Sequence, residues 1–371
     1  MSDPVALYIH WPFCQSKCPY CDFNSHVSDN INHDAWAESY LKELDYFAEL
    51  TKGRLVTSIF FGGGTPSLMN TDTVGKILNH ISKLWSIEKD CEITLEANPT
   101  SIEAGKFKDF RKAGINRVSV GVQALNDNDL KFFGRTHSAS EALAAVEVAR
   151  NTFDRYSFDM MYARPGQSAR DWEEELSRAL EYMEGHSSLY QLTIEPQTPF
   201  YTRAKRGEFR MPEENLSAEL YEVTESIMSE KGLESYEISN YAKRGEESRH
   251  NMGYWRYQDY LGIGPGAHGR VSINGNKHAT RMHRAPDIWL ERVGEKGHGL
   301  QADDILSSEE QNQEKIMMGL RLQEGVDVVL FDKDKLERLI VEGDLTRGGG
   351  KVSPTLQGRL RLNSVLDYLL N

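Results

Sequence analysis

Short apolar runs and amphipathic stretches alternate along the first 233 residues of the chain. The apolar runs predict six β-strands, at residues 6–10, 57–61, 92–96, 117–121, 157–161 and 190–195. A helical pattern follows each run, at about residues 33–50, 71–85, 101–113, 138–150, 168–184 and 213–231, with Asn32 and Thr71 as N-terminal caps. Strands that alternate with helices predict an α/β fold with a parallel sheet. This pattern is compatible with a doubly wound sheet and with an incomplete (β/α)6 barrel.

The regular alternation of strand and helix patterns ends near residue 233, and the composition changes there. We therefore divide the chain into three parts. Residues 1–233 form the predicted α/β core, and residues 234–300 are a connecting segment rich in aromatic residues, glycine and histidine. We expect irregular structure with short strands in this segment. Two amphipathic stretches, 307–322 and 333–342, then precede a glycine-rich turn between short strands and a final helix. Residues 301–371 therefore predict a small α+β domain that resembles a winged helix.

Composition narrows the class of protein. Hydrophobic residues make up 39% of the chain and charged residues 27%, which is typical of a globular protein. The net charge of −13 argues against a nucleic-acid binder. The N-terminal residues do not have the pattern of a signal peptide, and no apolar run is long enough to predict a transmembrane segment. We therefore expect a cytoplasmic protein, in a compartment that keeps cysteines reduced.

Three of the four cysteines lie within eight residues, as Cys14, Cys18 and Cys21 in a Cys-x3-Cys-x2-Cys arrangement after the first predicted strand. Thiolates are soft ligands that suit zinc or an iron–sulfur cluster. A zinc site of three cysteines and one histidine, His10 or His26, remains open at this point. The second possibility is a four-iron cluster, in which three thiolates leave one iron without a protein ligand. The fourth cysteine, Cys91, reads as a small buried apolar residue.

Polar and glycine residues follow the predicted strands at the point where each strand ends. The glycines of "FFGGGTPS" follow the second strand, and "TLEANPT" and "VSVGVQAL" end the third and fourth. The carboxyl ends of parallel strands in a βα barrel meet at one rim, where sites are built. We therefore expect a single cofactor site formed by the residues at these ends, namely Gly63, Gly64, Thr65, Glu96, Gln123, Arg135, Asp159 and Glu195.

The cysteine spacing and the GGTP segment resemble the radical S-adenosylmethionine (SAM) superfamily. That resemblance implies a partial (β/α)6 barrel as the fold of the core. It also implies a [4Fe-4S] cluster on Cys14, Cys18 and Cys21, whose open iron chelates SAM and whose electron cleaves it to a 5′-deoxyadenosyl radical. It places Tyr20, between the last two cysteines, near adenine, and the GGTP segment at the methionine ammonium. The residues implied to surround SAM are Tyr8, Tyr20, Gly63, Gly64, Thr65, Glu96, Gln123, Arg135 and Asp159.

Further motifs resemble one branch of this superfamily, the oxygen-independent coproporphyrinogen III oxidase (HemN) and its relative HemW. The resemblance covers nearly the whole chain, including a HemN-like C-terminal domain at 301–371. Phe23 stands where the oxidase has a fourth cysteine, and "HNMGYW" (250–255) fits the HNxxYW motif of the HemW branch. Arg164 stands where relatives usually have leucine, which leaves the packing near Asp159 in question.

The HemW resemblance implies a heme chaperone that binds a [4Fe-4S] cluster, SAM and heme, lacks oxidase activity and delivers heme to respiratory acceptor proteins. A partner at the membrane surface is compatible with this. His250, beside Tyr254 and Trp255, is the expected axial ligand of heme, because imidazole suits iron. His268, His278 and His283 are the competing candidates. The alternative functions are a coproporphyrinogen III oxidase of porphyrin biosynthesis and a zinc-binding interaction module without redox chemistry.

Overall fold

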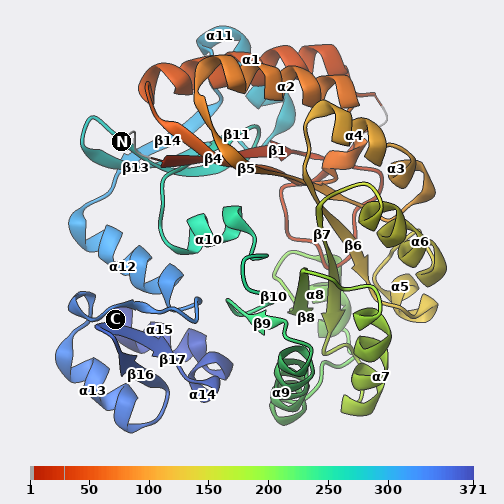
Figure 1. Cartoon of the computed structure of the whole chain (residues 1–371), viewed down its shortest axis with the longest axis vertical. Coiled ribbons are helices and arrows are strands. Elements are labelled where there is room, and N and C mark those ends of the chain that lie inside the picture. Colours follow the sequence, from red (N-terminus) through yellow and green to blue (C-terminus); the bar gives the residue numbers. More distant parts are fainter. Residues whose placement is uncertain (1–3, 29) are drawn as a thin grey trace.

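A twelve-stranded sheet curves around the middle of the molecule, and helices cover its outer face (Figure 1). The computed structural model describes residues 4–28 and 30–371. Seven neighbouring strands of the sheet are parallel, in the order β11 (Tyr260–Ile263), β1 (Pro4–Trp11), β4 (Leu55–Gly63), β5 (Ser86–Ala97), β6 (Arg117–Gln123), β7 (Arg155–Tyr162) and β8 (His186–Gln191). From β1 to β8 each strand lies beside the next one along the chain, so the winding does not reverse as it does in a doubly wound sheet. The predicted incomplete barrel is confirmed.

The outer helices bury one apolar face against the sheet, as their amphipathic pattern predicts. On the longest helix this face includes Trp36, Tyr40, Leu44 and Phe47, and the side chain of Asn32 caps its N-terminus. Thr71 was expected as a cap but is the first helical residue, after Asn70. The outer helices are α1 (His33–Leu50), α2 (Thr71–Leu84), α3 (Ser101–Gly105), α4 (Phe107–Ala113), α6 (Ala139–Arg150), α7 (Ala169–Leu180) and α9 (Glu214–Glu230).

Two predicted elements differ from the structure. The helix expected at 101–113 is divided at Lys106 into α3 and α4. The strand expected at 190–195 lies four residues earlier, as β8. Its first half contains Ser187 and Ser188, which are buried although they are polar. Their hydroxyls are satisfied, since Ser187 donates to the Phe158 carbonyl and Ser188 to the Asn240 side chain. An apolar run therefore does not mark this strand in the sequence.

The segment 234–300 contributes strands to both edges of the sheet. Beside β8 it adds β10 (Asn240–Ala242) and β9 (Glu234–Ser235), both antiparallel. Beside β11 the antiparallel strands β12 (His268–Ile273), β13 (Asn276–Met282) and β14 (Leu300–Ile305) extend the other edge. A short helix, α10 (Arg249–Trp255), lies inside the curve of the sheet, whereas α11 (Pro286–Lys296) packs outside on α1 (Figure 1).

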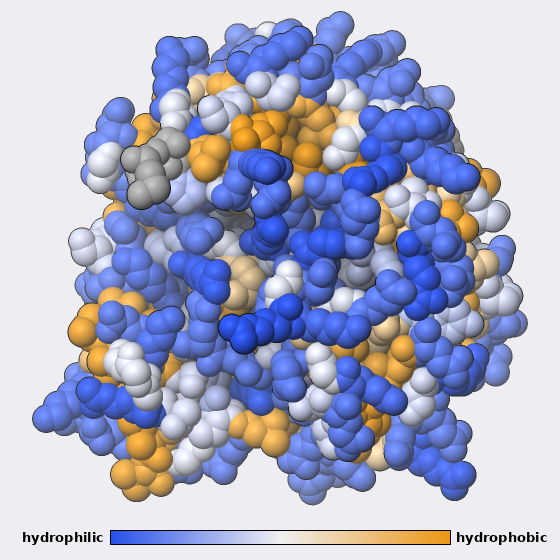
Figure 2. Space-filling view, viewed as in Figure 1, coloured by the Kyte–Doolittle hydropathy of each residue, from blue (hydrophilic) through white to orange (hydrophobic). Residues whose placement is uncertain are grey.

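Residues after β14 form a small α+β domain with its own apolar core. It lies beside the opening between the two sheet edges (Figure 1). The face shown in Figure 2 is mostly hydrophilic, and some of its apolar residues lie over this domain, which exposes Val329 and Val341. The elements are α12 (Ser308–Gly319), β15 (Val326–Asp327), η2 (Val328–Leu330), α13 (Lys333–Val341), β16 (Leu345–Gly348), β17 (Lys351–Pro354), α14 (Leu356–Leu360) and α15 (Leu362–Leu370).

Candidate functional site

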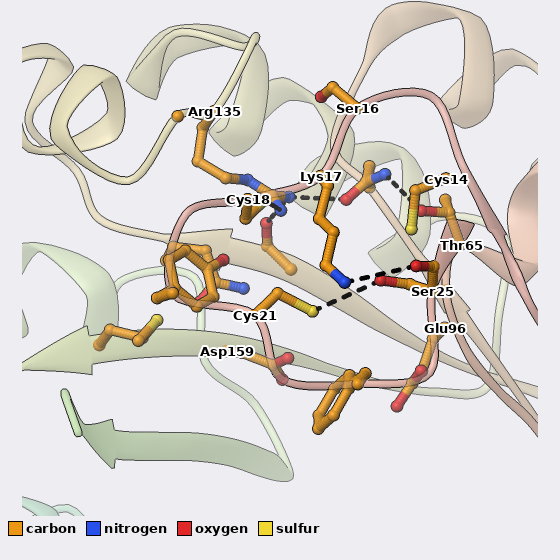
Figure 3. A pocket seen from close by; sticks show the side chains of 18 of the residues that line it. Cys14, Ser16, Lys17, Cys18, Cys21, Ser25, Thr65, Glu96, Arg135 and Asp159 are labelled. Carbon is orange, nitrogen blue, oxygen red and sulfur yellow. Dashed lines mark hydrogen bonds between the residues drawn. The ribbon is translucent and has the colours of Figure 1, made fainter. Parts of the chain in front are cut away.

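A cavity of about 460 Å³ opens where the carboxyl ends of the parallel strands meet. All but two of the predicted site residues line it, which brings together side chains from the cysteine loop and from the ends of β4 to β7. Figure 3 shows several of them from close by. The predicted residues in the lining are Cys14, Cys18, Tyr20, Cys21, Gly63, Gly64, Thr65, Glu96, Gln123, Arg135 and Asp159, together with Glu195. The exceptions are Tyr8 and His250.

The cysteine loop lies between two very short strands, β2 (Phe13–Cys14) and β3 (His26–Val27), which pair in parallel. All three cysteines line the same cavity, and Figure 3 shows them around one part of it. Arg135 donates a hydrogen bond to the sulfur of Cys18 at 3.5 Å, and the Ser25 hydroxyl lies 3.8 Å from the sulfur of Cys21. Burial raises the pKa of the Cys14 and Cys21 thiols. Donors aimed at sulfur stabilise the thiolate form that a metal cluster requires.

The placement of the possible metal-ligand side chains fits an iron–sulfur cluster better than a single zinc ion. Within residues 4–28 and 30–371, no three cysteine, histidine or acidic side chains are placed to share one metal ion. A four-iron cluster does not need such closeness, because each cysteine binds a different iron. His10, one proposed zinc ligand, has both ring nitrogens engaged, with the Tyr8 hydroxyl at 3.1 Å and the Asn24 carbonyl at 2.9 Å.

Two glycines at the end of β4 allow the strand to pack tightly against the cysteine loop. Gly63 has φ of +110°, in the left-handed region that favours glycine. A Cβ atom on Gly64 would lie 2.7 Å from the Phe13 carbonyl oxygen. The backbone amides of Gly64 and Thr65 donate to the carbonyls of Trp11 and Phe13, at 2.7 and 2.8 Å. A side chain at position 64 would therefore separate the two walls of the cavity.

Two partly buried carboxyl groups give the inner wall of the cavity an acidic character. Burial and the neighbouring Asp159 raise the pKa of Glu96 to about 8, although the backbone amide of Gly63 donates to it at 3.2 Å. Burial likewise raises the pKa of Asp159 to about 6, although the Ser119 hydroxyl donates to it at 3.2 Å. Each carboxylate is costly to ionise there without a cation. A positively charged ligand would supply the missing partner.

Arg135 connects three parts of the cavity wall. One of its nitrogens donates to the Asn98 side chain at 2.6 Å and to the Gly121 carbonyl at 2.8 Å, while the other reaches Cys18. Asn98 in turn donates to the Thr65 hydroxyl at 3.2 Å. The network therefore ties the ends of β4, β5 and β6 to the cysteine loop.

Tyr20 forms part of the cavity wall beside a separate apolar cluster. Its ring meets Phe133 edge to face, with 5.4 Å between ring centroids, and packs against the cluster that contains Leu130 and Phe200. Burial raises its pKa above the ordinary value. A rigid, neutral aromatic ring at this position suits a planar, uncharged part of a ligand.

Tyr8 and His250 lie in the barrel interior and do not line the cavity. The Tyr8 hydroxyl bonds to His10, and the ring of His250 stacks on Phe60 with 5.0 Å between centroids. Ser58 bonds to Nδ1 of His250 at 3.0 Å, and only 8% of the residue is exposed. Burial lowers the pKa of His250 to about 4, so the ring is neutral. The competing histidines, His268, His278 and His283, also lie outside the cavity lining.

The lining also contains residues that the sequence analysis did not single out. Asn98 was visible in "EANP", but its contact with Arg135 depends on the fold. Tyr190 was assigned to the start of a strand and instead lies near the carboxyl end of β8, facing the cavity. Lys17 lies between the cysteines, and its ammonium group is 3.5 Å from the Ser25 carbonyl (Figure 3).

Comparisons with known proteins agree with this geometry. A model of the radical SAM superfamily matches residues 8–179. The chain is 40% identical to "Radical S-adenosyl methionine domain-containing protein 1, mitochondrial" of Danio rerio, over 87% of this chain and 74% of that protein. It is 36% identical to "Heme chaperone HemW" of Escherichia coli, over 99% of this chain and 98% of that protein. The solved structure of E. coli coproporphyrinogen III oxidase (HemN), described as a radical SAM enzyme, superposes with a TM-score of 0.83 at 21% identity, covering 99% and 90% of the two chains.

The curved parallel sheet with a cysteine loop after its first strand defines a radical SAM fold, as the superfamily match and the HemN superposition also show. At 21% identity the likeness to HemN concerns the fold alone. The similarity to HemW proteins spans nearly the whole length of both chains, in E. coli and in Buchnera aphidicola. The chain belongs to the HemW-type family of radical SAM proteins.

Proposed function

We propose that this protein is a heme chaperone that holds a [4Fe-4S] cluster and SAM in the cavity and delivers heme to acceptor proteins. The observation that carries the cofactor part is the convergence of three cysteines and two partly buried carboxyl groups on one cavity. The heme part is supported by similarity to proteins named heme chaperone HemW over nearly the whole chain.

The residues of the cavity suit these cofactors in charge and shape. Cys14, Cys18 and Cys21 would ligate the cluster, which when bound supplies electron transfer and an iron with an open coordination position. Glu96 and Asp159 would face the positive charges of SAM, which removes the cost of ionising them. Arg135 holds Cys18 and the end of β6 in place, and Tyr20 offers a ring face for adenine.

The acceptor of the heme is proposed to be a respiratory protein, and contact at a membrane surface is compatible with this. No helix in residues 4–28 or 30–371 is long and apolar enough to cross a membrane. The relative from Danio rerio is named mitochondrial, whereas the E. coli relative is bacterial. A cytoplasmic location for this protein stays a prediction.

The alternative function, coproporphyrinogen III oxidase, would require a cysteine at the position of Phe23. Phe23 lines the cavity where the sequence resemblance to the oxidase would place a cysteine, and it is 60% exposed. Phenylalanine supplies neither a thiol ligand nor a proton, so a step that needs either is missing at this position. We therefore propose that the protein does not oxidise coproporphyrinogen III.

The test begins with protein purified and reconstituted without oxygen. Iron and sulfide analysis should give a four-iron cluster, calorimetry should show SAM binding, and hemin titration should show a saturable site. Incubation with coproporphyrinogen III, SAM and a reductant should give no product. Zinc in place of iron and sulfide would contradict the cofactor assignment, and turnover of coproporphyrinogen III would contradict the chaperone function.

A further inference from the structure

Different parts of the chain hold the two ends and the middle of the cysteine loop. Cys14 lies in β2, which pairs with β3. Arg135 donates to the sulfur of Cys18 in the middle of the loop. The residues after Cys21 are held by a third part, the segment 264–299 that follows β11, although none of this segment lines the cavity. The contacts at this end of the loop therefore connect the site to a region outside it.

Asn24 fixes the end of the loop through its side-chain amide. The amide nitrogen donates to two backbone carbonyls, those of Pro265 and Arg284, at 2.9 and 3.0 Å. The next residue along the chain, Ser25, places its hydroxyl 3.8 Å from the sulfur of Cys21. The position of this hydroxyl therefore depends on the two carbonyls to which Asn24 donates.

Both of these carbonyls are fixed by one carboxylate, that of Glu43 on α1. Gly264 immediately precedes the first carbonyl, and its amide donates to Glu43 at 2.7 Å. His283 immediately precedes the second, and its amide donates to the carbonyl of Gly299 at 2.9 Å. The amide of Gly299 donates in turn to Glu43, at 2.7 Å. Two separate chains of hydrogen bonds therefore run from Glu43 to the side chain of Asn24.

The chemistry at Glu43 requires a side chain that only accepts hydrogen bonds. Glu43 is fully buried, and the Trp289 indole donates to it at 3.1 Å in addition to the two glycine amides. Burial raises the pKa of Glu43 to about 7, and these three donors oppose the rise. A neutral amide in place of the carboxylate would turn an N–H group toward at least one of the donors. A buried N–H group would then be left unpaired.

The turn after β11 packs tightly against both α1 and the cysteine loop. Gly264 has φ of +100°, and a Cβ atom there would lie 2.5 Å from the carbonyl oxygen of His10. The hydroxyl of Tyr40 on α1 donates to the same carbonyl at 2.6 Å. A Cβ atom on Gly266 would collide with the side-chain amide of Asn24. A shift of this turn would therefore also move the end of the cysteine loop.

We propose that Glu43 and Asn24 are positioning residues of the cluster site, because Glu43 fixes the turn after β11 and the residue before β14, and Asn24 holds the Cys21 end of the cysteine loop against them. The pair is called the Glu43–Asn24 brace below. Neither residue lines the cavity. Hydrogen bonds to the ligand sulfur atoms help to set the reduction potential of an iron–sulfur cluster. The inference rests on the proposed function as far as the cluster is concerned.

The first test needs no cofactor and measures hydrogen exchange in the full-length apoprotein. Glu43→Gln and Asn24→Ala should each speed the exchange of the backbone amides in residues 22–27 roughly tenfold, because buried hydrogen bonds that hold this stretch are lost. Thr224→Val is the matched control. It removes a buried hydrogen bond to Trp172 between α7 and α9, at the other end of the parallel sheet (Figure 1). It should lower the melting temperature and leave this exchange unchanged.

The second test uses the protein with its cluster reconstituted without oxygen. Glu43→Gln and Asn24→Ala should each lower the midpoint potential of the cluster and speed its loss in air, because the Ser25 hydroxyl is no longer held at the sulfur of Cys21. The double variant should have the same potential as Asn24→Ala alone, since the two residues act through one set of contacts. Thr224→Val should keep the wild-type potential.

Three results would overturn the Glu43–Asn24 brace. The first is wild-type exchange of residues 22–27 in the Glu43→Gln apoprotein. The second is a lowered melting temperature with an unchanged potential, which is what a purely structural role gives. The third is an additive effect in the double variant. If the wild type assembles no iron–sulfur cluster, the proposed function fails, whereas the exchange comparison still decides whether Glu43 and Asn24 hold the loop.

Discussion

Arg135 donates a hydrogen bond to the sulfur of Cys18 at 3.5 Å and so joins two segments that lie 117 residues apart in the sequence. Its second terminal nitrogen is held by Asn98 and by the Gly121 carbonyl, which fixes the guanidinium in one place. A fixed positive charge beside a cysteine favours the thiolate that ligates iron. The arginine therefore couples the cysteine loop to the rim of the sheet.

Replacing Arg135 with glutamine should make the cluster less stable without unfolding the protein. Gln can still bond to one of the three acceptors, but it brings no charge to Cys18. We expect faster loss of cluster absorbance when the reconstituted protein is exposed to air. Arg170→Gln, on the surface of α7, is the control and should keep the wild-type rate. An equal rate in both variants would show that the charge of Arg135 is not needed by the cluster.

Replacing any one of Cys14, Cys18 and Cys21 with alanine should abolish the cluster, because each thiolate is expected to hold a different iron. Cys91→Ala should keep it. Cys91 is buried on β5 away from the cavity, and burial together with Glu88 and Glu92 raises its pKa to about 12, so it stays a neutral thiol. Iron and sulfide content per chain is the measurement. A full cluster in the Cys18 variant would remove that residue from the ligand set.

The stability of the protein without SAM should depend on pH through Glu96. The folded protein keeps this carboxyl protonated up to a pKa of about 8, whereas the unfolded chain releases the proton near 4.5. The folded state thus binds the extra proton in this window, and the free energy of unfolding should fall as pH rises, by up to about 1.4 kcal/mol per pH unit. Asp159 has a pKa of about 6 and contributes mainly below that pH.

Urea denaturation of wild type and Glu96→Gln at about pH 6 and about pH 8 measures this effect. The glutamine variant should lose less stability over this range, because it has no proton to release. SAM should bind it more weakly than wild type, since an ionised carboxylate and its charged hydrogen bond are missing. Parallel pH profiles for the two proteins would contradict the raised pKa of Glu96.

Several features of the site could be predicted from the sequence because they depend on rules that hold for any parallel βα array. The polar residues toward the carboxyl ends of β4 to β7 had to meet at one rim, and the cysteine spacing marked the loop after β1. The position of Tyr8 and His250 in the barrel interior, below the cavity, could not be predicted in this way. Tyr8 lies on the inner face but in the middle of β1, and His250 reaches the barrel interior only because α10 enters it from another part of the chain. The position of strand β8 was predicted four residues too late, because several of its buried residues are serine and histidine rather than apolar residues.

Phe23→Cys should not create coproporphyrinogen III oxidase activity. The substitution adds a thiol at an exposed position of the cavity lining, but it changes neither the acidic inner wall nor the rest of the chain. The cluster should assemble as in the wild type, because three ligands are already in place. Product formation from coproporphyrinogen III under anaerobic, reducing conditions is the measurement. Activity in this variant alone would show that one missing thiol separates the two functions.

A buried ion pair behind the cavity explains how the departure at Arg164 is accommodated. Arg164 follows β7 and pairs with Glu175 on α7, and both side chains are buried. Glu175 also accepts a hydrogen bond from the backbone amide of Leu125, at 2.6 Å, which holds the loop after β6. The two strand ends that this pair connects contain Gln123 and Ala163, both with positive φ, of 71° and 57°. Strained backbone of this kind persists where surrounding contacts fix it.

Glu175→Gln should destabilise the protein by up to about 3–5 kcal/mol, because Arg164 is left buried with only Asp129, at 3.4 Å, as a charged partner. It should also weaken SAM binding, because the Leu125 amide then donates to a neutral oxygen, which holds the loop after β6 less firmly than a carboxylate does. The double variant Arg164→Leu with Glu175→Gln should recover most of the stability, since it removes the uncompensated charge and the glutamine can still accept from Leu125. Glu174→Gln, on the exposed side of the same helix, is the control and should leave the free energy of unfolding unchanged. Urea denaturation gives the coupling between the two sites, and calorimetry gives SAM affinity. If the double variant is no more stable than Glu175→Gln alone, the pair does not act as a unit, and the loop after β6 is held by other contacts.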